Sequence, residues 1–289
     1  MPYLNPVDPA TANLWGTTRL APATSVPSSI SSTSSTSVTS VTSSTSVTPA
    51  VGTGFGVPGY AHPLVARAEW AALTDPGIPL HWVVLDVADG PGDRPDPHCL
   101  EAAGRLRNAG VRVLGRIDSA YGARGLGEVI SAAHRYLDWY LADGFLLDRC
   151  PAGREELPEI RRTVTTLRLI GDSEPHVVLG HGTHPHPGYA ENADQLVTFS
   201  GPWSDYRWSQ VAEWTAGYPP EKFCHFVHGV PGGHLDEALR IARWQGAATI
   251  WFTDRTVRGG DEEDPRDPWA AMPGYWDEIV SRLGPGVSE

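Results

Sequence analysis

Short apolar runs alternate with longer segments of mixed polarity from residue 54 onward. The runs are GFGVPGY (54–60), HWVVLDV (81–87), VRVLGRID (111–118), GFLLD (144–148), HVVLG (176–180), QLVTFS (195–200), KFCHFVHGV (222–230) and ATIWFTD (248–254). Most are rich in β-branched and aromatic residues, and Gly or Pro often lies close by. This pattern predicts a series of buried strands.

The segments between the runs have the periodicity of amphipathic helices. In 127–144, Val129, Ala133 and Tyr136 recur at helical spacing, and 234–246 repeats the pattern before Gly246, which suits a helix C-cap. Regular alternation of strand and helix predicts a parallel sheet. Eight such units in roughly 230 residues predict a closed (β/α)8 barrel, whose usual size is about 250 residues. An open doubly wound sheet is the alternative, although no GxGxxG motif follows a strand into a helix.

The N-terminal segment has a different composition. Residues 28–48 are almost entirely Ser and Thr, so they bury too little apolar surface to offset the entropy of ordering. We therefore expect 1–52 to be a disordered Ser/Thr-rich tail or linker and 53–289 to form the barrel. A glycosylated stalk of an exported protein and a plain linker both fit this composition.

Charge and composition exclude several classes of partner. The net charge of −12 argues against nucleic acid, which requires a basic surface. No apolar stretch approaches the roughly 20 residues of a membrane span. The first residues lack the basic and apolar regions of a recognisable signal peptide, so the localisation stays unknown from the residues alone. We expect a monomer with a polysaccharide or oligosaccharide ligand.

Cysteine and histidine spacing predicts neither a metal nor another cofactor. Cys99, Cys150 and Cys224 are far apart and form no zinc-binding motif. The histidines of the segment 181–186 are interrupted by prolines, so they do not share a helix face as metal ligands at i, i+4 do.

Polar and aromatic residues gather at the ends of the predicted strands, where (β/α)8 barrels carry their functional sites. Carboxylates there would bind sugar hydroxyls, and aromatic rings would stack on sugar faces. The candidates are Tyr60, His62, Asp86, Arg116, Asp118, Tyr121, Asp148, His181, Ser200, Trp203, His228 and Asp254.

Several of these pieces together resemble a known family. VPGYAHP, VVLDVADGPGDRPDP, AGVRVLGRIDSAYGARG, YLDWYLADGFLLD, VVLGHGTHPHPGY, ADQLVTFSG, EKFCHFVHGVP and WFTD resemble, in order and spacing, the spherulation-specific family 4 (spherulin 4-like) proteins. The resemblance covers about residues 54–276. It implies a (β/α)8 barrel of glycoside hydrolase lineage, an extracellular or cell-surface location, and an α-1,4-linked galactosamine or N-acetylgalactosamine polymer as substrate.

The resemblance also implies a catalytic pattern that this chain keeps only in part. Such proteins carry an Asp-Glu pair after the fourth strand and a Glu after the sixth. Asp148 matches the aspartate, whereas Arg149 and Ser200 stand at the two Glu positions. In the same comparison Asp86 replaces a common Asn and Arg116 a common Tyr. Gly180 and His181 replace a common Asn-Pro.

The missing acids leave the activity open. Glycoside hydrolysis usually needs two carboxyl groups, and neither Arg nor an unactivated Ser replaces one. The period of two places Asp86 on one face of its strand and places Arg116 and Asp118 together on one face of theirs. If these faces point inward, Asp86 and Asp118 converge on Asp148. Asp148 with Asp86 or Asp118 would then be the catalytic set.

Arg116 points inward in the same arrangement, and a guanidinium there would neutralise the carboxylates. A substrate-assisted reaction, with the N-acetyl group of the sugar as nucleophile, would need only one protein acid. Three hypotheses remain. The chain is a glycoside hydrolase, a catalytically inactive protein that still binds glycan, or a structural surface protein without a ligand.

Overall fold

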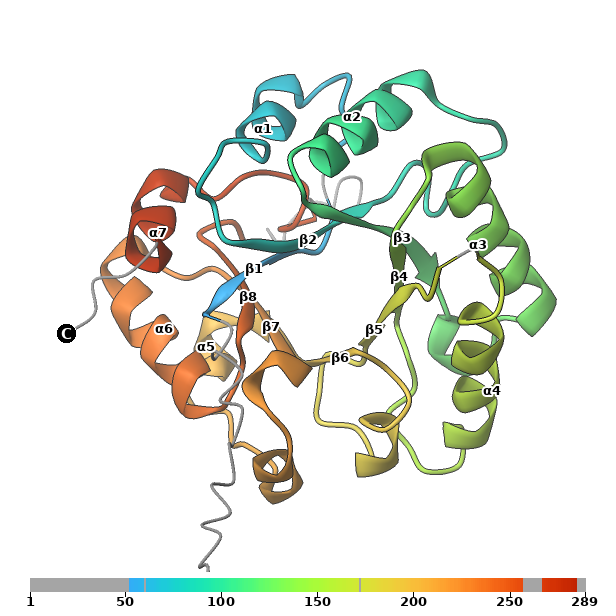
Figure 1. Ribbon diagram of the computed structural model, residues 1–289. Coiled ribbons are helices and arrows are strands. Elements are labelled where there is room, and N and C mark those ends of the chain that lie inside the picture. Colours follow the sequence, from blue (N-terminus) through green and yellow to red (C-terminus); the bar gives the residue numbers. More distant parts are fainter. Residues whose placement is uncertain (1–51, 60, 172, 257–266, 285–289) are drawn as a thin grey trace, which may run out of the picture. The chain divides into compact units, whose positions relative to one another are not determined.

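The computed structural model describes residues 52–59, 61–171, 173–256 and 267–284. These residues form a closed barrel of eight parallel strands in the order of the sequence, surrounded by helices (Figure 1). The strands are β1 Gly54–Val57, β2 Leu80–Leu85, β3 Arg112–Asp118, β4 Gly144–Asp148, β5 His176–Gly180, β6 Gln195–Pro202, β7 Phe223–His228 and β8 Thr249–Thr253. The predicted (β/α)8 barrel is confirmed, and the closed strand order excludes the open sheet.

Helices cover the outside of the barrel. They are α1 Arg67–Ala72, α2 Pro97–Asn108, α3 Leu126–Tyr140, α4 Leu157–Leu167, α5 Trp203–Tyr206, α6 Leu235–Trp244 and α7 Trp276–Leu283. No helix among the described residues is long and apolar enough to cross a membrane. The predicted Ser/Thr-rich tail lies outside the described residues, so its disorder stays a prediction.

The interior of the barrel combines apolar packing with one buried polar network. Trp82 donates its indole N–H to Gln195 Oε1 at 2.6 Å, and Gln195 Nε2 donates to Thr249 Oγ1 at 2.9 Å. Gly56 on β1 makes room for this filling, because a Cβ there would lie 2.5 Å from the Trp82 ring. The network links β2, β6 and β8 across the barrel and fixes which strand faces point inward.

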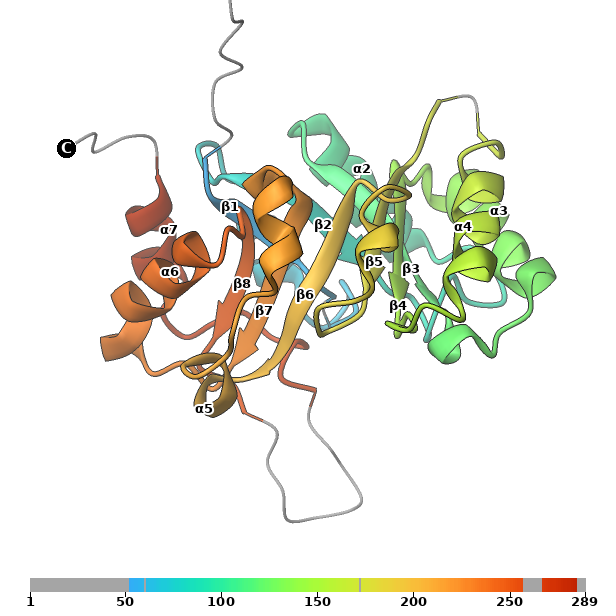
Figure 2. The same cartoon turned by 90° about the horizontal axis from the view of Figure 1, so that it is seen from below.

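The orientation of β3 positions the polar site. Gly115 faces outward against α3, where an added Cβ would lie 2.3 Å from the Tyr136 ring. Alternate residues of a strand point to opposite sides, so Arg116 faces the interior. Its register partner on β4 is Leu146, and Asp118 pairs with Asp148 at the carboxyl ends of both strands. Polar residues of two neighbouring strands therefore meet at one rim of the barrel. Figure 2 shows the ribbon of the barrel turned by 90°.

Candidate functional site

Two cavities adjoin at the carboxyl end of the barrel. The first has a volume of about 310 Å³ and the second about 280 Å³. Four residues line both: Leu146, Asp148, Ser200 and Phe226. Asp148, the carboxylate that the sequence analysis placed at the end of β4, therefore lies at the junction of the two cavities.

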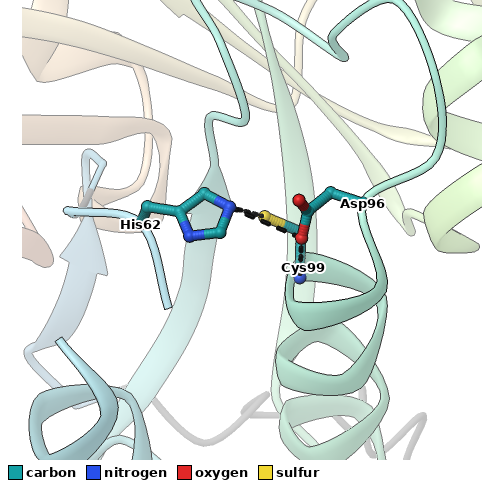
Figure 3. Close-up of side chains that lie close together, drawn as sticks. All are labelled: His62, Asp96 and Cys99. Atoms are coloured by element: carbon teal, nitrogen blue, oxygen red, sulfur yellow. Dashed lines mark hydrogen bonds and ion pairs between the residues drawn. The ribbon is translucent and has the colours of Figure 1, made fainter. Parts of the chain in front are cut away.

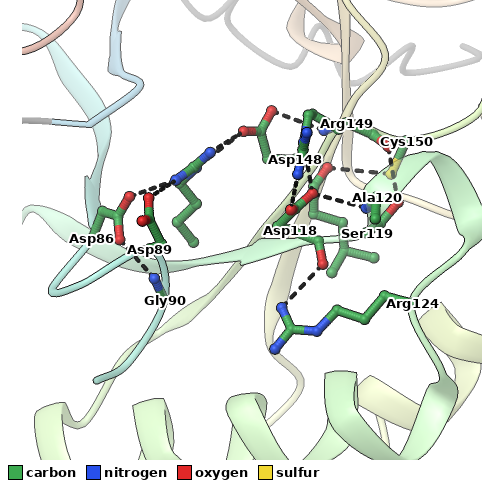
Figure 4. A network of polar contacts seen from close by, with 12 residues as sticks. Asp86, Asp89, Gly90, Asp118, Ser119, Ala120, Arg124, Asp148, Arg149 and Cys150 are labelled. Carbon is green, nitrogen blue, oxygen red and sulfur yellow. Dashed lines mark hydrogen bonds and ion pairs between the residues drawn. The ribbon is translucent and has the colours of Figure 1, made fainter. Parts of the chain in front are cut away.

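Arg116 connects the carboxylates of the first cavity. Its Nη1 donates to Asp86 Oδ2 at 2.6 Å, and its Nε and Nη2 donate to Asp148 Oδ2 at 3.0 and 2.8 Å. This guanidinium thus bridges Asp86 and Asp148, two carboxylates that are labelled in Figure 4. Burial opposes the charge of Arg116, but Asp148 and Asp86 together raise its pKa above its usual value. The guanidinium is therefore a fixed positive charge between two carboxylates.

Asp118 belongs to a second ion pair and lines neither cavity. Arg149 Nε donates to Asp118 Oδ1 at 2.9 Å, and Arg149 Nη2 bonds to Asp118 Oδ2. The Ala120 N–H donates to the same carboxylate at 2.8 Å. The hydrogen bonds from Arg149 are the main reason why the pKa of Asp118 lies below its usual value. Arg149 therefore favours the ionised form of Asp118.

The loops that carry this ion pair have unusual backbone conformations. Ala120, Tyr121 and Arg149 have φ angles of 47°, 55° and 50°, a region that residues with a Cβ seldom adopt. The loops are cross-linked, since Tyr121 N–H donates to the Arg149 carbonyl at 2.7 Å and the Ser119 hydroxyl donates to it at 3.0 Å. Such conformations cluster at functional sites. Here they hold the exposed Tyr121 ring beside the Arg149 guanidinium, 5.7 Å away.

The lowered pKa of Asp118 predicts a pH-dependent contribution to stability. A carboxyl whose pKa is lower in the folded state stabilises the protein above the unfolded value, about 3.9, and loses this effect as the pH falls through the folded value. Wild type should therefore have a higher free energy of unfolding than Asp118→Asn at about pH 7, and this difference should shrink at about pH 2.5. Urea titration at the two pH values measures it. Asp138→Asn, an exposed change on α3, is the control. A difference that stays constant with pH would contradict this account.

Some predicted ligand residues do line the cavities. His62 and Arg116 line the first, Tyr121 and His181 the second, and Ser200 both. His181 donates its Nδ1–H to the Pro151 carbonyl at 2.9 Å, and burial lowers its pKa to about 4. The imidazole is therefore neutral and can accept a hydrogen bond at Nε2.

The remaining predicted ligand residues lie elsewhere. Trp203 is buried, 7% exposed, and lines neither cavity. Asp254 accepts the Gly274 N–H at 2.8 Å, and His228 packs against Trp269 with its ring 5.7 Å away. Neither Asp254 nor His228 lines either of these two cavities. Tyr60 lies outside the described residues.

Two aromatic residues of the first cavity were missed from the sequence. Phe226 points into the barrel from β7, where its ring lies 6.0 Å from that of Trp82. The alternation along β7 places it opposite to the fully buried His225, so the period of two could have identified it. Trp269 comes from the segment after β8 and packs against Phe226 at 6.1 Å. No sequence periodicity marks Trp269, which lies in an irregular connection.

The chain matches known proteins over most of the barrel. Residues 55–283 match the model of the family described as spherulation-specific family 4. Spherulin-4 of Physarum polycephalum is 23% identical over 188 residues, which cover 62% of this chain and 56% of that protein, so the chain spans little more than half its length. The structure of Aspergillus clavatus Sph3, solved in complex with GalNAc, superposes with a TM-score of 0.67 at 24% identity and covers 81% of this chain and 99% of that one. The family match and the shared barrel agree, and the chain belongs to the spherulation-specific family 4.

Proposed function

We propose that this chain binds an amino-sugar polysaccharide of the galactosamine type at the two adjoining cavities and does not hydrolyse it. The observation that carries the proposal is the bridge that Arg116 makes between Asp86 and Asp148. The family fold is that of carbohydrate-acting, glycoside hydrolase-like barrels, and Sph3 was solved with GalNAc bound. The bound sugar of Sph3 supports the class of ligand, while the chemistry depends on the residues of this chain.

The paired carboxylates argue against turnover. A catalytic carboxyl has to reach the glycosidic oxygen or the anomeric carbon, so a carboxylate held in an ion pair must first leave its partner. Asp86 and Asp148 both contact Arg116, and Asp118 contacts Arg149. Hydrolysis by Asp148 with Asp86 or Asp118 would require these ion pairs to open. Hydrolysis is the alternative, and it would release new reducing ends from the polymer.

Two other carboxylates in the first cavity lie at its open edge. Asp89 is fully exposed, and its Oδ1 lies 3.7 Å from Arg116 Nη1. Asp267 is exposed and accepts the Trp269 N–H at 2.9 Å. Exposed carboxylates of this kind suit the recognition of hydroxyl or ammonium groups, because a carboxylate has about four acceptor positions and these contacts leave most of them open.

The cavities also supply the apolar contacts that a sugar ring needs. Trp269 and Phe226 form a wall of the first cavity, and Tyr121 borders the second. Aromatic rings present broad, rigid faces to a ligand at low cost in side-chain entropy. With Asp148 between the cavities, an oligosaccharide that occupies both would contact carboxylate oxygens near its middle and aromatic faces on either side.

Substitution of Trp269 tests this site directly. Trp269→Ala should weaken the binding of galactosamine oligosaccharides by about 10-fold, as expected for the loss of roughly 1.4 kcal/mol of ring contact, measured by calorimetric titration. Trp203→Ala, which removes a buried tryptophan outside the cavities, should lower the melting temperature and leave the affinity of the folded protein unchanged. The proposal fails if wild type does not bind the oligosaccharides saturably, or if both variants bind like wild type.

A further inference from the structure

Three side chains of metal-ligating type meet beside the first cavity. His62 comes from the connection after β1, while Asp96 and Cys99 come from the start of α2. One ligand atom from each lies within 4.8 Å of the others, and Figure 3 shows the imidazole pointing toward the thiol and the carboxylate. The set combines a nitrogen, an oxygen and a sulfur ligand.

The distances in this cluster match those between ligand atoms of one metal ion. His62 Nε2 lies 3.4 Å from Cys99 Sγ and 3.4 Å from Asp96 Oδ1. The second distance is longer than the usual range of a hydrogen bond between nitrogen and oxygen. A tetrahedral zinc ion, with bonds of about 2.0–2.1 Å to nitrogen and oxygen and about 2.3 Å to sulfur, holds its ligand atoms roughly 3.3–3.6 Å apart.

We propose that His62, Asp96 and Cys99 bind a Zn²⁺ ion. A set of three protein ligands leaves the fourth tetrahedral position for water or a ligand group, as in open zinc sites. The His62 and Asp96 side chains are 28% and 29% exposed, whereas Cys99 is buried. The open position therefore lies on the side of His62 and Asp96, away from Cys99, and His62 also lines the first cavity.

The surrounding bonds keep two of the three ligands in place. Asp96 is the N-cap of α2, and its Oδ1 accepts the N–H groups of His98 and Cys99 at 2.9 and 3.0 Å. A carboxylate has about four acceptor positions, so capping leaves capacity for a metal. Cys99 is fixed by its place in the first turn of the same helix. The ion would add a link between this helix and the connection after β1.

His62 has to change its tautomer to take part. Its Nδ1 accepts the Leu64 N–H at 3.2 Å, which places the proton of the neutral ring on Nε2. Metal binding at Nε2 moves that proton to Nδ1 and releases the Leu64 amide. Leu64 is 47% exposed, so water can replace the lost hydrogen bond.

The donor set selects zinc over the common hard cations. Mg²⁺ and Ca²⁺ prefer all-oxygen sites with six or more ligands, whereas thiolate and imidazole ligands suit Zn²⁺. No spacing motif in the sequence predicts this site, because His62 and Cys99 are 37 residues apart and only the fold brings them together.

The test uses the full, untagged chain after dialysis against a chelator. Calorimetric titration with Zn²⁺ should show one ion per chain, and Co²⁺ should produce the thiolate charge-transfer band in the ultraviolet and the visible bands of a tetrahedral site. Cys99→Ser should abolish the charge-transfer band and weaken Zn²⁺ binding by more than about 100-fold, since even outer-shell changes cost 10- to 100-fold. Cys224→Ser, at another buried cysteine, should change neither.

His62→Gln gives an independent measurement if Cys99→Ser does not fold. His62 is partly exposed, so its replacement should leave the barrel intact, as checked by circular dichroism, while Zn²⁺ affinity falls by a similar factor. The proposal is overturned if wild type binds no stoichiometric zinc, if the cobalt complex lacks the thiolate band, or if both variants bind zinc as tightly as wild type.

Discussion

Replacement of Arg116 by Ala should lower the free energy of unfolding by about 3 kcal/mol, the lower end of the range for breaking a buried ion pair from one side. The variant leaves Asp86 and Asp148 without their shared partner, and their charges then repel each other. The three side chains are only 21% to 31% exposed, so water screens this repulsion incompletely. Urea unfolding followed by circular dichroism measures the change.

An exposed ion pair provides the matched control. Arg105 bonds to Glu101 on the surface of α2, with side chains 63% and 59% exposed, and Arg105→Ala should change stability by no more than about 0.5 kcal/mol. Arg116→Lys keeps the charge without the planar geometry that reaches both carboxylates, so its stability should lie between wild type and Arg116→Ala. Equal stability of Arg116→Ala and wild type would show that the bridge is not formed in solution.

Asp148→Asn should weaken the binding of an oligosaccharide that spans both cavities by about 10- to 100-fold. A hydrogen bond to a charged group contributes about 1.5–3 kcal/mol, and Asp148 is the one charged residue that lines both cavities in the described part of the chain. Titration calorimetry with oligosaccharides of increasing length measures the effect. The loss should grow once the ligand is long enough to occupy both cavities.

Asp86→Asn is the matched comparison, because Asp86 bonds to the same guanidinium but lines only the first cavity. Its effect on affinity should be smaller than that of Asp148→Asn for long ligands. Identical losses in the two variants would indicate that the ion bridge as a whole, and not direct contact with Asp148, controls binding.

The alternation of strand residues accounts for what the sequence predicted well. The periodicity of strands and helices predicted the closed barrel. The period of two placed Arg116 on the same strand face as Asp118, so that Arg116 would point inward together with the carboxylates. The structure bears this out, since Arg116 contacts both Asp86 and Asp148. Local pattern was sufficient here because neighbouring parallel strands fix one another's register.

The parts that could not be predicted depend on loops. Asp118 lies on the same face of β3 as Arg116, yet its carboxylate bonds to Arg149 in the loop after β4. Arg149 has a positive φ, a backbone conformation that the strand pattern does not predict. Trp203 follows β6 directly, but it begins the short helix α5 and packs against Tyr206, with the two ring centres 6.2 Å apart. Periodicity carries no information on such turns, and the contact between His62 and Cys99 is equally invisible to it.

The most direct test of the central claim is the release of reducing ends by wild-type protein incubated with partially deacetylated α-galactosamine polymer, with binding measured on the same samples. Binding without new reducing ends above the protein-free blank is the predicted result. Reducing ends that accumulate with wild type and disappear with Asp148→Asn would contradict the proposal, because they would show that Asp148 acts as a catalytic group despite its pairing with Arg116.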